Sequence, residues 1–155
     1  MLISDLLIPK QIKLDLVNDK RLPAISEVAA LIEGNPNVVH LPGFYADLLA
    51  REQLESTLLV TNVSFAHART DHLKGMVLAI GRSKKGIVFE NTGKTVRLIF
   101  VVGTPKRMAT EYLSVVGALA RVVKGASTRN KLLEAPAPED VIDIVTAAEK
   151  GHKIL

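Results

Sequence analysis

His67 is the side chain in this sequence best placed to do chemistry, because arginines and hydroxyl groups stand near it along the chain. It ends the apolar stretch "NVSFA", Arg69 follows it closely, and Arg51, Ser56 and Thr57 belong to the segment before. A neutral imidazole has a nitrogen lone pair that can attack phosphorus, so a histidine can itself carry a phosphoryl group. Such a transfer needs an arginine to balance charge and donors for the phosphoryl oxygens, and it can proceed without a metal. The other interpretation, that His67 merely caps a strand and hydrogen-bonds a carbonyl, stays open.

Other reaction chemistries find little support in the sequence. There is no cysteine, which excludes disulfides, thiolate metal sites and a cysteine nucleophile. The glycine-rich phosphate loop and the H-E-x-x-H and G-x-S-x-G motifs are absent from the sequence as well. His67 and His72 lack the spacing of a helical zinc pair, and Ser64 would face away from His67 on a strand. We therefore expect no metal site, no cofactor and no serine catalysis.

Composition indicates a single globular domain over residues 1–155, with 48% hydrophobic and 23% charged residues. The formal net charge of +4 would favour acidic or phosphorylated partners. Aromatic residues make up only 4% of the chain, and the basic clusters at 82–85 and 105–107 are interpreted as solvated loop charges, so nucleic-acid binding is disfavoured. No long apolar run and no signal-peptide pattern is present, which predicts a cytoplasmic protein without membrane insertion.

Two helices are predicted ahead of the histidine. In "RLPAISEVAALIEGN", Pro23 suits a first helical position and Gly34 can end the helix. In "LPGFYADLLAREQLES", Pro42 again starts an amphipathic helix, which places Arg51 near its C-terminal end. The predicted helix therefore delivers Arg51 just before the next element begins.

Strands are predicted next, in "TLLVTNVSFA", "GMVLAIGR" and "TVRLIFVVG", and the first of them would end at His67. Residues 96–102 are almost all apolar, which is typical of a central strand buried on both faces. A helix capped by Thr104 with Pro105 in its first turn follows, then a short helix from Ser127 and a last one from Pro138. This order predicts an α/β (α+β) domain in which helices flank a mixed β-sheet.

The stretch "LLAREQLESTLLVTNVSFAHART" resembles the signature of the enzyme IIA domains of the bacterial phosphoenolpyruvate:sugar phosphotransferase system, in the fructose/mannitol and nitrogen-regulatory class. That family runs L-x-x-R-E-x-x-x-S-T and then a glycine-containing segment ending in Pro-His, whose histidine is phosphorylated. The matching residues here are Leu48, Arg51, Glu52, Ser56, Thr57 and His67. The similarity continues through "GIVFENTGKTVRLIFVVGTP" and covers about residues 5 to 148.

The resemblance implies a phosphocarrier or signalling protein whose active histidine lies in a shallow groove. His67 would accept a phosphoryl group from the carrier HPr and pass it to a IIB domain, or use it to regulate partner proteins. Arg51 would balance the phosphoryl charge, and Thr57 would donate to its oxygens or else only begin a strand. Neither the sugar, the regulatory target nor the oligomeric state follows from the sequence.

Three departures from the family pattern favour an alternative. Residues 62–67 read "NVSFAH", so the family's glycine and its proline before the histidine are both missing. The family's second histidine falls on Tyr112, which can donate a hydrogen bond to phosphate but lacks the charge change of imidazole. Tyr112 could instead be a core residue of its helix with the hydroxyl at the rim. The alternative is a regulatory binding module that keeps the IIA fold without efficient phosphotransfer.

Overall fold

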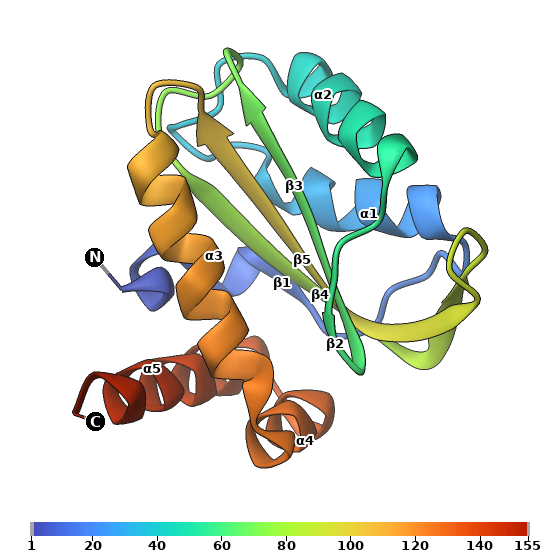
Figure 1. Cartoon of the computed structure of the whole chain (residues 1–155), viewed down its shortest axis with the longest axis vertical. Helices are drawn as coiled ribbons and strands as arrows, with labels where there is room; N and C mark the ends of the chain where they lie inside the picture. Colours follow the sequence, from blue (N-terminus) through green and yellow to red (C-terminus); the bar gives the residue numbers. More distant parts are fainter. Residues whose placement is uncertain (1, 155) are drawn as a thin grey trace.

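The computed structural model describes residues 2–154 and shows a mixed five-stranded sheet with helices on both faces (Figure 1). The strands are β1 (Ile12–Lys13), β2 (Leu58–Val60), β3 (Asn62–Thr70), β4 (Val77–Phe89) and β5 (Lys94–Pro105). They lie in the order β1-β4-β5-β3-β2, with β1 parallel to β4, β3 parallel to β5, and the other two pairs antiparallel. The predicted mixed sheet is confirmed, and the apolar strand β5 lies at its centre.

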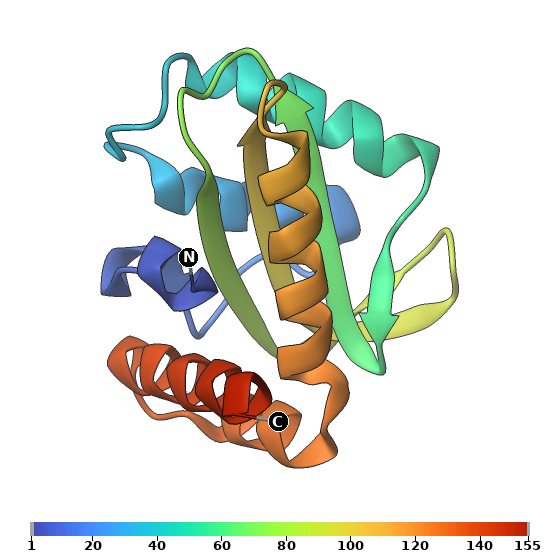
Figure 2. The same cartoon turned by 60° about the vertical axis from the view of Figure 1, so that its left-hand side comes forward.

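Each face of the sheet carries its own hydrophobic core. The helices are α1 (Arg21–Ala29), α2 (Leu41–Leu54), α3 (Ala109–Lys124), α4 (Ala126–Glu134) and α5 (Pro138–Ile154), with short 3-10 turns at Ile3–Leu6, Pro9–Gln11 and Ala30–Ile32. Helices α1 and α2 cover one face and α3 crosses the other, while α5 packs at one end beside the N-terminal turns (Figures 1 and 2). Because side chains alternate along a strand, β3 gives Phe65 to the α3 side and Ala66 to the α2 side.

The predicted strand in "TLLVTNVSFA" is two antiparallel strands, which corrects the sequence interpretation. Asn62 has a positive φ of 70°, a left-handed conformation that asparagine tolerates, and this turn separates β2 from β3. His67 does not end the strand either. Strand β3 continues to Thr70 because β5 pairs with it in parallel as far as Pro105. His67 is thereby held by a paired strand, opposite Val102, instead of by a loop.

The predicted start of the helix after β5 is also wrong. Thr104 and Pro105 belong to β5, and α3 begins at Ala109. The strand persists because Thr104 is buried within the sheet and the N–H of Lys106 still donates to the carbonyl of Thr70. Smaller shifts occur elsewhere: α1 begins before Pro23, at Arg21, and α4 begins before Ser127, at Ala126.

The interpretation of residues 82–85 as solvated loop charges holds for the exposed side chains of Lys84 and Lys85, but it is wrong for Arg82 and for the loop. Strand β4 runs through this cluster without a break, and only 6% of Arg82 is exposed. Its guanidinium donates to the carbonyls of Leu132, Leu133 and Ala135 at the end of α4, and to that of Leu14. The side chain therefore ties β4 to the C-terminal helices.

None of the helices within residues 2–154 is long and apolar enough to cross a membrane.

Candidate functional site

The sequence-predicted residues His67, Arg51 and Tyr112 line one hollow of about 640 Å³. Helix α2, strand β3, the turn after β5 and helix α3 form its walls. The lining residues are Asp47, Ala50, Arg51, Leu54, His67, Ala68, Arg69, Lys106 and Tyr112. Another hollow, of about 410 Å³ beside β2, has Lys94 as the sole titratable residue in its lining. The first hollow therefore holds the groups suited to phosphoryl chemistry.

The imidazole of His67 is held by aromatic contacts on the α3 side of the sheet. It stacks on the ring of Phe65, two positions earlier on the same face, with 4.6 Å between centroids, and lies 5.6 Å from the ring of Tyr112. Its Nδ1 is 3.4 Å from the carbonyl oxygen of Phe65. A proton on Nδ1 would be donated to that carbonyl, which leaves the lone pair on Nε2. Ser64 is fully buried, and the alternation of side chains along β3 places it on the opposite face from His67, as the sequence predicts.

The surroundings of His67 favour its neutral form. Burial lowers the pKa of His67 below its usual value of 6.5, the Arg51 charge lowers it further, and the Phe65 carbonyl opposes this in part. Since the folded-state pKa is depressed, this group contributes stability that is present above the unfolded pKa and is lost as pH falls through the folded pKa. The ring is therefore uncharged at neutral pH, which is the form that an attack on phosphorus would require.

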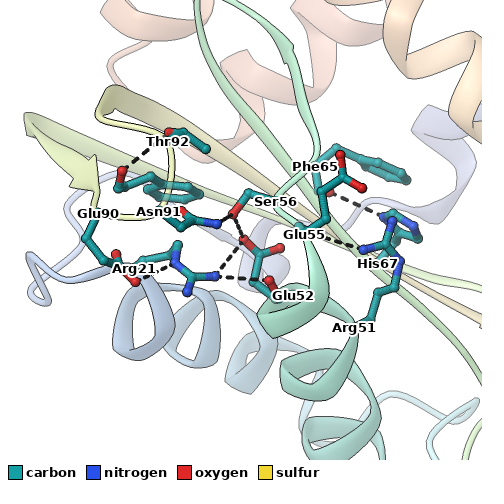
Figure 3. Close-up of polar contacts among 11 residues, drawn as sticks. Arg21, Arg51, Glu52, Glu55, Ser56, Phe65, His67, Glu90, Asn91 and Thr92 are labelled. Atoms are coloured by element: carbon teal, nitrogen blue, oxygen red, sulfur yellow. Dashed lines mark hydrogen bonds and ion pairs between the residues drawn. The ribbon is translucent and has the colours of Figure 1, made fainter.

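Arg51 reaches the hollow from the last turn of α2. Its Nη1 donates to the carbonyl oxygen of Glu55 at 2.9 Å. One nitrogen of the guanidinium is therefore bound to the main chain at the end of its own helix. The side chain extends toward His67, as Figure 3 shows. Other donors of the guanidinium fork remain for an anion in the hollow.

Thr57 is the predicted site residue that does not line the hollow. It precedes β2, and its carbonyl oxygen accepts the N–H of Phe65 at 2.8 Å, which closes the β2–β3 hairpin. Ser56 likewise turns to another partner, the carboxylate of Glu52. The structure thus brings together three of the four predicted residues.

Lys106, which the sequence predicts to be a solvated loop charge, lines the hollow together with Arg69. Nη2 of Arg69 donates to the carbonyl of Lys106 at 3.3 Å, and the ammonium of Lys106 is 3.3 Å from the carboxylate of Asp71. The signal lay in the parallel pairing of β3 with β5, because parallel strands bring their C-terminal ends to the same edge of a sheet.

No group of three or more histidine and acidic side chains in the described part of the chain could hold a metal ion.

The sequence matches a protein-family model over residues 5–148, described as the phosphoenolpyruvate-dependent sugar phosphotransferase system, EIIA 2. It is 25% identical to the fructose-specific EIIABC component of Bacillus subtilis over 97% of this chain and 24% of that protein. It is 31% identical to a fructose-specific EIIA component of Haloferax volcanii over 63% of this chain and 64% of that protein. The chain thus spans less than two thirds of these two relatives. With the nitrogen regulatory protein of Pseudomonas aeruginosa, identity is 22% over 97% of this chain and 98% of that protein.

Solved structures share the fold. The nitrogen regulatory protein IIA-Ntr of Neisseria meningitidis superposes with a TM-score of 0.82 at 28% identity, covering 92% of this chain and 98% of that one. IIA mannitol of Escherichia coli gives a TM-score of 0.76 at 18% identity, covering 90% of this chain and 98% of that one. The second likeness concerns the fold alone.

Proposed function

The chain belongs to the EIIA 2 family of the phosphoenolpyruvate-dependent sugar phosphotransferase system, and from this premise we propose that it carries a phosphoryl group on His67. The observation that supports this most directly is the shared hollow, in which Arg51 and Tyr112 lie beside a half-buried His67 whose pKa is lowered by burial and by Arg51. Family membership supports a phosphocarrier or regulatory role. The residue that accepts the group, its donor and its receiver are parts of the proposal.

In the proposed transfer, Nε2 of neutral His67 attacks the phosphorus of a phosphohistidine on HPr. The new N–P bond forms as the N–P bond to the donor histidine breaks, and the donor imidazole leaves with the electron pair of that bond. Arg51 balances the charge on the phosphoryl oxygens, and the hydroxyl of Tyr112 donates a hydrogen bond to one of them. No metal is required for this exchange between two nitrogen nucleophiles.

A IIB domain or a regulatory target is the proposed receiver. A solved complex of IIA mannitol with phosphorylated IIB mannitol from Escherichia coli shares the fold of this chain, with a TM-score of 0.78 at 16% identity. The likeness to nitrogen regulatory proteins supports a signalling output equally well. We keep both receivers within the proposal.

A second candidate function rests on Tyr112, which stands where the family has a second histidine. A tyrosine hydroxyl offers a hydrogen bond but no charge change near neutral pH, which would suit a regulatory module that binds partners without efficient phosphotransfer. The position of Tyr112 in the hollow, 5.6 Å from the His67 ring, fits either function. Phosphorylation of the intact protein separates the two.

The test is intact-mass analysis after incubation with phosphoenolpyruvate, enzyme I and HPr. The reaction is quenched at alkaline pH because phosphohistidine is acid-labile. We expect a gain of about 80 Da, one phosphoryl group on a nucleophilic histidine, and no gain in His67→Gln. A known IIA protein serves as the positive control for the relay. No gain with a working relay would contradict the carrier function and favour the binding module.

A further inference from the structure

A buried polar network lies next to Arg51 and does not line the hollow. It includes Glu52 and Ser56, two motif residues to which no role has yet been given. Arg21 of α1 and Glu52 of α2 are 7% and 3% exposed and form an ion pair with 3.3 Å between Nη1 and Oε1. The same Nη1 donates to the main-chain carbonyl of Glu52 at 3.1 Å, and Nε donates to Glu90 at 2.9 Å. Ser56 donates to the Glu52 carboxylate and accepts from the amide of Asn91 at 2.9 Å, as Figure 3 shows.

This arrangement ties the end of α2 to two other elements. Arg21 joins it to the start of α1, and Asn91, through Ser56, joins it to the turn between β4 and β5. Glu90 of the same turn binds Arg21 and so holds the arginine in place. The carboxylate of Glu52 also holds Ser56, four residues later, so the intervening turn is fastened at both ends. That turn contains the carbonyl of Glu55, to which the guanidinium of Arg51 is bound.

A buried ion pair is a costly way to gain stability alone. Burial raises the pKa of Glu52, and its hydrogen bonds from Ser56 and Arg21 offset this only in part. Apolar side chains of similar volume often replace such pairs with no loss of stability, whereas a polar network can specify one geometry. Arg51 has a long side chain with many rotamers, so the position of its guanidinium depends on how firmly the turn that anchors it is held.

We propose that Arg21 and Glu52 are positioning residues that hold the last turn of α2 so that the Arg51 guanidinium lies against His67. The inference rests on the proposed roles of Arg51 and His67. It adds that these roles depend on residues that do not line the hollow.

The decisive variant is the double replacement Arg21→Met with Glu52→Leu, which removes both charges and keeps apolar volume. Its matched control is Glu149→Gln, because Glu149 is also a buried carboxylate, 7% exposed, but it binds the N–H groups of Ile3 and Ser4 far from the hollow. Arg51→Ala shows the effect of losing the guanidinium altogether. Asp47, Arg69, Lys106 and Tyr112, the other titratable groups lining the hollow, are the same in every variant.

The first readout is the pKa of His67, measured in the unphosphorylated protein by an NMR pH titration of the ring protons. Because the Arg51 charge contributes to lowering this pKa, Arg51→Ala is expected to raise it. We expect the double variant to raise it in the same direction by at least half as much, and Glu149→Gln to leave it unchanged. A wild-type pKa in the folded double variant would overturn the proposal. A wild-type pKa in Arg51→Ala would overturn it too, because Arg51 would then not lie against the ring.

A milder variant covers the case in which the double variant does not fold. Arg21→Lys keeps the positive charge but lacks the fork of donors that reaches Glu52 and Glu90 together. It is expected to raise the His67 pKa by a smaller amount, and an unchanged pKa in folded Arg21→Lys would then contradict the proposal.

The second readout is phosphotransfer from phosphorylated HPr. We expect kcat of the double variant to fall about 10-fold or more, the effect of misplacing a charged hydrogen-bond donor, while KM for HPr stays within about twofold. An unchanged kcat would count against a positioning role. If wild-type protein accepted no phosphoryl group, the proposed function would fail, but the pKa comparison, made without phosphorylation, would still decide whether Arg21 and Glu52 position Arg51.

Discussion

At the scale of single residues, Arg51 would serve both the resting and the phosphorylated state of His67 under the proposed function. In the resting state its charge adds to burial in lowering the pKa of His67, which keeps the imidazole neutral and nucleophilic. Once a phosphoryl group is attached, the same charge would be attractive, since the group carries negative charge. One guanidinium therefore disfavours the unreactive protonated ring and favours the proposed product.

Tyr112 supplies the residue-scale prediction. Burial raises the pKa of Tyr112 above 10, and the nearby charges of Arg51 and Arg69 offset this only in part, so its hydroxyl is a donor at neutral pH. Tyr112→Phe keeps the ring against His67 and removes only that donor. A hydrogen bond to a charged group is worth about 1.5–3 kcal/mol, so we expect phosphotransfer to slow by roughly 10-fold or more.

The measurement is the rate of phosphoryl transfer from phosphorylated HPr, compared with Tyr45→Phe. Tyr45 is the other tyrosine of the chain, lies on α2 and is not part of the hollow's lining. Wild-type transfer rates in Tyr112→Phe would mean that Tyr112 only packs against the imidazole.

At the scale of elements, Glu27 joins α1 to the segment after β1. Its carboxylate accepts from the N–H groups of Val17 and Asn18, from the Asn18 amide, and from Lys13 at 2.8 Å. Burial would raise the pKa of Glu27, but these hydrogen bonds outweigh it and lower the pKa to about 2 from the usual 4.5. One carboxylate thereby fixes the loop that leads into the helix.

The consequence is a pH-dependent contribution to stability. Because the folded-state pKa of Glu27 is depressed, its contribution is fully present above pH 4.5 and is lost as pH falls toward about 2. Glu27→Gln is expected to lower the free energy of unfolding by about 1–3 kcal/mol at neutral pH. Denaturant titrations at several pH values should show the difference from wild type shrinking across this window, and a constant difference would contradict the assignment.

The extent of the elements was the part of the fold that sequence could predict least well. Apolar patterning predicted α2, the central strand β5 and the helix carrying Tyr112, because burial imposes a period on each of them. It could not predict that β3 runs on through His67 to Thr70, since that length is set by pairing with β5, a strand distant in sequence. For the same reason Thr104, a good N-cap by type, remains within a strand.

The candidate site divides along the same line. His67, Arg51 and Tyr112 could be proposed as site residues from the sequence. The family resemblance points to their positions, and the chemistry of each side chain suggests a role. Lys106 and the pair of Arg21 with Glu52 could not, because their roles depend on which segments meet in space. Arg82 is the extreme example, as a basic residue in a charged cluster proves to be buried against carbonyls of a distant helix.

At the scale of the whole molecule, the hollow depends on how closely α2 approaches the sheet. Gly103 of β5 allows this approach, because a Cβ there would clash with Cδ1 of Leu73 and would lie 2.8 Å from Cε1 of Phe44. Phe44 is fully buried near the start of α2 and packs directly over the central strand. The distance between helix α2, which carries Arg51, and the sheet, which carries His67, therefore depends in part on the absence of a side chain at Gly103.

Gly103→Ala should disturb stability and site together. Overpacking of this kind typically costs about 1–3 kcal/mol, and relief by an outward shift of α2 would carry Arg51 away from His67. We expect a lower denaturation midpoint and a raised His67 pKa in the same variant. Gly125→Ala is the matched control, since a Cβ at Gly125 would meet nothing within 4 Å and its φ of −80° suits alanine. Equal midpoints for the two variants would show that Leu73 and Phe44 yield without cost. A lowered midpoint with an unchanged His67 pKa would place the strain in the core alone and leave α2 where it is.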